Sequence, residues 1–161
     1  MATLYEAAGG IEGLTRLAEA WHERVMDDEV VGHAFSHGFD DHHTERLAAY
    51  WAEALGGPEL FTGMGGNETS VVRMHSGNGE HDEMNHRAVA CFDAALEDVG
   101  LVEQHLAQTL HDYFAWATWT TMYRFHASAD DVPDGLEIPR WSWNGLLSSS
   151  DRDRSGPHAS E

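Results

Sequence analysis

One stretch of the chain holds a histidine whose imidazole could bind a metal. Residues 71–84 read VVRMHSGNGEHDEM and place His75 between a short apolar turn and a glycine-rich turn. A neutral imidazole is the commonest metal ligand among protein side chains. A histidine at the C-terminus of a helix can also lie on the surface, where it interacts favourably with the helix dipole. Both interpretations stay open from this stretch alone.

Twelve histidines in 161 residues permit a second kind of metal site. His33 and His37 are spaced i, i+4, and residues 81–86, HDEMNH, supply two more histidines with two acids. Two histidines and a carboxylate can hold non-haem iron or zinc, which would make the protein a hydrolase or an oxygenase. No segment matches the HExxH pattern, however, and the histidine pairs lie on different predicted elements.

The composition limits the partners and the chemistry. A net charge of −19 argues against nucleic acid and anionic membrane, because both are bound mainly through basic residues. All nine basic residues are arginine, which excludes lysine Schiff bases and the usual phosphate-binding loop with lysine. The single cysteine, Cys91, excludes an internal disulfide and suits a cytoplasmic location. No apolar run approaches the roughly 20 residues that span a bilayer, and we expect no signal peptide.

Apolar residues recur at helical spacing through most of the chain, which predicts an all-α fold without strands. The predicted helices cover residues 3–8, 11–27, 42–55, 81–99 and 103–126, with a short helical piece after Asp27. We interpret residues 58–70 as a loop. The expected division is a domain at 1–126, an extension at 127–147 that packs on it, and a polar, disordered tail at 148–161.

Several sequence features, taken in their order and spacing, resemble those of the truncated haemoglobins, and most closely those of the group II branch. They are the Gly-Gly pair after the first helix, VMDDEV before Phe35, TERLAAY followed by GGP, RMH ending at His75, and CFDAAL. The resemblance covers about residues 4–126. It implies a globin-like two-over-two helical sandwich, haem b as the cofactor, and reversible binding of O2 or of other diatomic ligands, CO and NO. The alternative it leaves open is a haem redox enzyme, a nitric oxide dioxygenase or peroxidase-like, with an external reductase.

The resemblance also assigns expected roles to single residues. His75 falls on the proximal iron ligand, Phe35 on the aromatic residue at the haem edge, and Leu47 on the apolar residue above the iron. The distal ligand-binding positions hold His43 and His22, the latter where the family usually has a tyrosine. Further expected haem contacts are Arg46 and Arg73 near the propionates, with Met74, Ala88 and Phe92.

The distal side departs from the family pattern. Ala88 stands where group II has a tryptophan, so we expect less bulk in the distal pocket. His22 and His43 would place two imidazoles there. This leaves open whether His43 binds the iron before an external ligand does. A globin fold without haem, acting as a sensor module, is a third hypothesis, against which His75 and Phe35 together argue. The chain could be a monomer or a homodimer.

Overall fold

The computed structural model describes residues 2–34, 42–77, 82–122, 124–125 and 127–147. Helices dominate this part of the chain. They are α1 (Leu4–Ala7), α2 (Gly10–Asp27), α3 (Val31–Ala34), α4 (His43–Ala54), α5 (Leu60–Gly63), α6 (Glu68–Met74), α7 (Asp82–Asp98) and α8 (Gln104–Trp116). A π-helical turn (Ala117–Thr121), a 3-10 turn (Ala129–Asp131) and two short strands, β1 (Trp141–Ser142) and β2 (Gly145–Leu146), follow.

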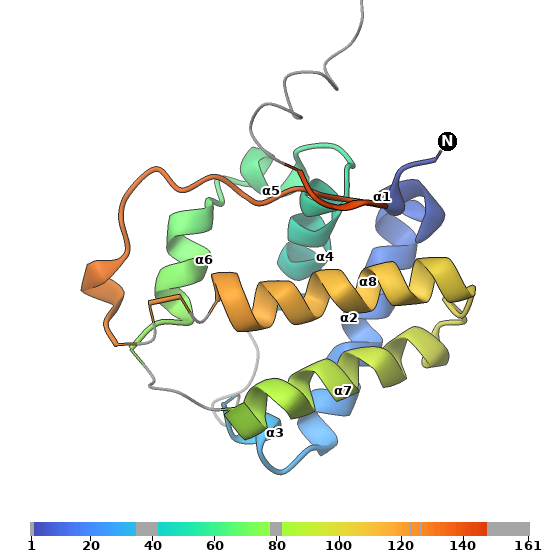
Figure 1. The fold of residues 1–161 in the computed structure, drawn as a ribbon, viewed down its shortest axis with the longest axis horizontal. Helices are drawn as coiled ribbons and strands as arrows, with labels where there is room; N and C mark the ends of the chain where they lie inside the picture. Colours follow the sequence, from blue (N-terminus) through green and yellow to red (C-terminus); the bar gives the residue numbers. More distant parts are fainter. Residues whose placement is uncertain (1, 35–41, 78–81, 123, 126, 148–161) are drawn as a thin grey trace, which may run out of the picture.

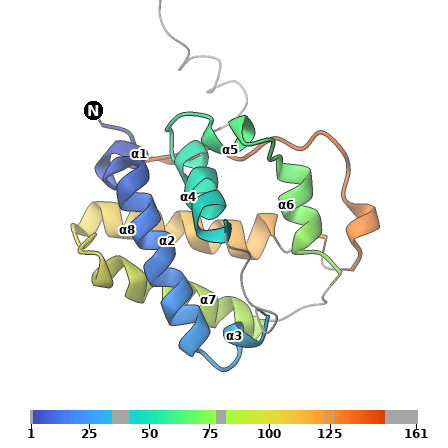
Figure 2. The same ribbon diagram turned by 180° about the vertical axis from the view of Figure 1, so that it is seen from behind.

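Four long helices form two crossed layers. Helix α2 packs on α4, α7 packs on α8, and α2 also contacts α7 across the layers (Figures 1 and 2). This arrangement confirms the predicted all-α fold, a globin-like two-over-two sandwich. The short helix α6, which ends just before His75, lies to one side of α4 (Figure 2).

Glycine allows the tight corner between α1 and α2. Gly9 adopts a φ of 96°, in the left-handed region that side chains disfavour. A Cβ at Gly13 would lie 2.0 Å from the carbonyl oxygen of Ala8, so only glycine lets the two helices approach this closely. The corner therefore fixes the direction in which α2 enters the sandwich.

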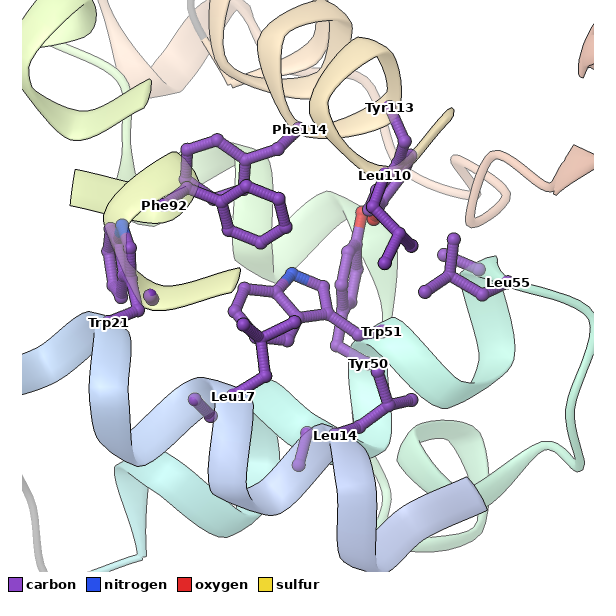
Figure 3. Close-up of a cluster of buried hydrophobic side chains, with 14 of the residues drawn as sticks. Leu14, Leu17, Trp21, Tyr50, Trp51, Leu55, Phe92, Leu110, Tyr113 and Phe114 are labelled. Carbon is purple, nitrogen blue, oxygen red and sulfur yellow. The ribbon is translucent and has the colours of Figure 1, made fainter. Parts of the chain in front are cut away.

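Aromatic rings from all four long helices fill the core (Figure 3). Phe92 of α7 stacks on Phe114 of α8 with ring centroids 4.2 Å apart. Trp51 of α4 meets both rings edge-on, at 5.6 and 6.2 Å. The indole Nε1 of Trp21 in α2 donates to the carbonyl of Ala88 in α7 at 3.1 Å. These contacts hold the two layers together because each ring buries a large apolar area.

The segment after α8 runs back over the helices, past α6 and α5 to α1 (Figure 1). Trp141 packs on Trp116, with centroids 5.3 Å apart, and Trp143 donates from Nε1 to the carbonyl of Ala2 at 2.9 Å. The backbone N–H of Leu136 donates to Oγ1 of Thr69 in α6. The division into 1–126, 127–147 and 148–161 stays a prediction, and 148–161 lies outside the described residues.

The structure corrects three local predictions. The predicted loop at 58–70 contains α5 and the start of α6, because the Asn67 side chain caps α6 by accepting from the N–H of Ser70. The last helix stops at Trp116 and gives way to the π-helical turn, where threonines replace the good helix formers. The hairpin of β1 and β2, which was not expected, turns at residues 143–144, and Gly145 begins β2 with a φ of 102°.

No helix among the described residues is long and apolar enough to cross a membrane.

Candidate functional site

Helix α6 positions His75. Its first turn is capped by Asn67, and its last residue, Met74, is followed directly by His75 at the C-cap. Gly77, with a φ of 80°, then turns the chain away. Ser76 is buried and its hydroxyl donates to the carbonyl of Val72. His75 is therefore held at a fixed helix end.

The hydrogen bond of the His75 ring determines its tautomer. Nδ1 lies 2.8 Å from the carbonyl oxygen of Val71, and a carbonyl can only accept, so Nδ1 carries the proton. Nε2 then keeps its lone pair, which is the form that ligates metals. The residue as a whole is exposed, but desolvation of its ring, opposed by the Val71 bond, lowers its pKa. His75 therefore offers a neutral, oriented nitrogen donor.

His22 of α2 and His43 of α4 are hydrogen-bonded to each other. Nε2 of His22 lies 2.8 Å from Nδ1 of His43, and Nδ1 of His22 lies 2.8 Å from Oγ1 of Thr44. Burial, and then the nearby charge of His43, lowers the pKa of His22 to about 4. The two rings are therefore in contact, and His22 is neutral at neutral pH.

The other residues expected at the site differ in how far they are buried. Leu47 is half-buried one turn after His43 on α4, while Ala88 and Phe92 are buried on α7. Met74 and Arg46 are exposed. Phe35 lies outside the described residues.

Arg73 is engaged with the C-terminal segment. Its Nη2 donates to the carbonyl of Val132 at 3.2 Å and to the carboxylate of Asp134 at 2.8 Å. The guanidinium therefore ties the last turn of α6 to residues 132–134. Its expected propionate contact stays a prediction.

Asn85 is a polar residue that the sequence analysis missed. It is 3% exposed, and its Nδ2 has no hydrogen-bond partner among the described residues. It lies on α7 one turn before Ala88 and two turns before Phe92, on the same buried face. A buried amide without a partner is costly, which suggests that it serves a group bound beside this face.

Glu68 is a second buried polar residue outside the expected site. Its Oε2 accepts from the hydroxyl of Tyr50 at 2.7 Å, which joins the first turn of α6 to α4. Burial raises the pKa of Glu68 to about 7, against the opposing effect of the Tyr50 bond. Glu68 also lines a cleft of about 630 Å³ with Glu53 and Arg140.

The metal-binding side chains of this site fit haem better than they fit a bare metal ion. Among the described residues, no three His, Cys, Asp or Glu side chains come together as a metal site. His33 is exposed, and His37 and His81 of the non-haem hypothesis lie outside the described residues. A single protein nitrogen such as Nε2 of His75 can hold a metal that brings most of its ligands with it, as haem iron does. The orphaned amide of Asn85 fits the same view.

Comparison with known proteins agrees with this fold. The family model described as bacterial-like globin matches residues 3–121, so the chain belongs to the bacterial-like globin family. It is a haem-binding globin of the truncated haemoglobin type. The chain is 30% identical over 101 residues to the group 1 truncated haemoglobin GlbN of Synechocystis, which covers 62% of this chain and 73% of that protein.

Solved structures show the same fold. The thermostable haemoglobin of Thermobifida fusca is 28% identical, with a TM-score of 0.64 over 75% of this chain and 97% of that one. The group II truncated haemoglobin of Bacillus anthracis is 20% identical, with a TM-score of 0.62 over 73% of this chain and 94% of that one. The relatives thus carry both group names.

Proposed function

We propose that the protein binds haem b through Nε2 of His75 and reversibly binds O2, CO or NO on the distal side. The observation that carries this proposal is the bond from Nδ1 of His75 to the carbonyl of Val71. This bond leaves Nε2 unprotonated and holds the ring in one orientation, as is usual for metal-binding histidines. When bound, haem supplies the iron that takes the diatomic ligand.

We assign the distal role to His43, with His22 as its support. A neutral imidazole can donate one N–H, and a polarised ligand accepts it. His22 holds His43 through the 2.8 Å contact between their rings and is itself held by Thr44. Leu47, one turn along α4, contributes an apolar wall that limits access of water. In this account His43 stabilises the ligand and does not bind the iron itself.

We assign Arg46 to the haem propionates because it is exposed on the same helix as His43 and Leu47. A guanidinium can bind a carboxylate through two parallel hydrogen bonds. Met74, Ala88 and Phe92 complete the proposed haem contacts, and Phe35 is assigned from the sequence alone. Arg73 remains a second candidate for the propionates, although Asp134 already holds it.

We place the protein in the group II branch and in the cytoplasm. The order of its motifs supports the branch, and some similar solved structures carry that name. The buried, free Cys91 is consistent with a reducing compartment. A haem redox function, NO dioxygenation or peroxidase-like chemistry with an external reductase, is the second candidate, since the linked imidazoles of His22 and His43 can exchange protons.

Absorption spectra of the purified protein in the ferric, ferrous, O2 and CO forms test the proposal. We expect one haem per chain and an O2 form that returns to the ferrous form when O2 is removed. A pigment that cannot form a CO complex, or a protein without an intense haem band, would contradict it. An O2 form that oxidises at once, with fast turnover when a reductase is added, would favour the redox function.

A further inference from the structure

We propose that Thr44, His22 and His43 form a proton path from a surface depression to the distal side of the haem site. The proposal rests on the proposed function, which places His43 beside the bound ligand. It adds a role for Thr44 as an outer relay and a second role for His22, which links the depression to His43. The path would serve any distal reaction that consumes or releases a proton.

The contacts are continuous. Oγ1 of Thr44 and Nδ1 of His22 are 2.8 Å apart, and Nε2 of His22 and Nδ1 of His43 are also 2.8 Å apart. Both nitrogens of the His22 ring are therefore engaged, each with one neighbour along the path. Hydrogen bonds of this length allow proton transfer between the bonded atoms.

The chain has two neutral arrangements. In one, the Thr44 hydroxyl donates to Nδ1 of His22, Nε2 of His22 donates to Nδ1 of His43, and Nε2 of His43 carries a proton. In the other, every donor and acceptor is exchanged, and Nε2 of His43 presents a lone pair. Whether the Thr44 hydroxyl donates or accepts thus determines whether Nε2 of His43 can donate or accept a hydrogen bond.

Passage between the two arrangements moves one proton. Water protonates the Thr44 oxygen as its hydroxyl proton passes to Nδ1 of His22. The proton of Nε2 passes to Nδ1 of His43, and the proton on Nε2 of His43 leaves to an acceptor on the distal side. One proton enters and one leaves, so no charge remains on the chain. The reverse sequence carries a proton outward.

The outer end of the path opens on an acidic depression. Thr44 and His22 line a hollow of about 540 Å³ together with Glu19, Glu23 and Asp27 of α2. Exposed carboxylates attract protons to the mouth of the path. Beside Thr44 in the chain, the exposed pair of His42 and Glu45 lies 3.5 Å apart at the start of α4. The low pKa of His22, about 4, keeps it neutral at rest, which suits transfer along the chain and not storage of a charge.

Exchange of the His43 ring N–H with solvent, measured by NMR on the ferrous CO complex, tests the path. His22→Gln keeps an amide that can bond both neighbours but cannot pass a proton, and His22→Phe removes both bonds. Thr44→Val removes the outer hydroxyl. Thr15→Val is its matched control, since the Thr15 hydroxyl donates within its own helix to the carbonyl of Ile11. The Trp21 Nε1–H, bonded to Ala88, reports general loosening within the same molecule.

We expect His22→Gln and His22→Phe to slow exchange of the His43 proton by about ten-fold or more, with Trp21 unchanged. Thr44→Val should slow it less, because water in the depression can reach His22, and Thr15→Val should have no effect. If the CO spectrum is intact, unchanged exchange in His22→Gln would overturn the path. Equal slowing in Thr15→Val would overturn it as well. Failure to form the CO complex would instead overturn the proposed function, and the path with it.

Discussion

Replacement of Glu68 by glutamine should stabilise the protein above pH 7 and change how its stability depends on pH. The carboxyl group of Glu68 is buried and accepts a hydrogen bond from Tyr50. Burial raises its pKa from 4.5 to about 7. Between these values the folded protein holds a proton that the unfolded chain releases. Stability from this group is therefore complete below pH 4.5 and is lost as the pH rises through 7.

The size of the effect follows from the two pKa values. The difference between 4.5 and about 7 corresponds to about 3 kcal/mol of unfolding free energy. His22 acts in the opposite direction, because burial lowers its pKa from 6.5 to about 4, so its contribution to stability rises with pH over that window. The two effects oppose each other in the wild type. Only a variant that removes one of them reveals the other.

Urea unfolding at pH 5, 6, 7 and 8 measures the effect. Glutamine is a neutral mimic of the protonated carboxyl, so Glu68→Gln should match the wild type near pH 5 and exceed it by about 1 to 3 kcal/mol at pH 8. Glu53→Gln is the matched control, because Glu53 is equally buried but accepts from Thr62, and its loss should destabilise at every pH. A Glu68→Gln difference that is equal at pH 5 and pH 8 would refute the reasoning.

Three further perturbations have expected outcomes. His43→Leu should raise the O2 dissociation rate by roughly ten- to a hundred-fold and affect CO far less, since a bond to a polarised ligand contributes about 1.5 to 3 kcal/mol. Stopped-flow rates within three-fold of wild type would contradict it. Asn85→Leu should raise the unfolding free energy of the haem-free protein by about 1 kcal/mol, measured in urea, because it removes an unpartnered buried amide. Deletion of residues 148–161 should leave haem content and melting temperature nearly unchanged; a large drop in either would show that the tail is docked.

Local patterns predicted most of the helices. Apolar spacing located α2, α4 and α7 within one or two residues of their observed bounds. The glycines around residues 56–66 concealed α5 and the start of α6, because the sequence does not show that Asn67 would act as a helix cap. The β1–β2 hairpin is only two residues per strand, too short for an alternating pattern.

A residue of the candidate site was predictable where its position depends on its own helix alone. His75 follows from α6 and its glycine turn. The contacts of Thr44 with His22 and of Glu68 with Tyr50 join different helices, so no local pattern shows them. Asn85 was missed because asparagine in a helix is usually solvent-facing, and only its spacing from Ala88 and Phe92 could have indicated burial.

Arg73 illustrates a limit of charge patterns. With 28 acidic residues in the chain, the sequence could not indicate which one Arg73 would meet. The structure gives Asp134, from a segment far along the chain.

The most direct test of the central claim is the ferrous absorption spectrum of His75→Gly, recorded with and without added imidazole. We expect the variant to lose haem, or to keep it without the signature of an axial nitrogen, and imidazole to restore the wild-type spectrum. His33→Gly, at an exposed histidine, is the control and should match the wild type. A His75→Gly protein with a wild-type ferrous spectrum in the absence of imidazole would show that another residue binds the iron.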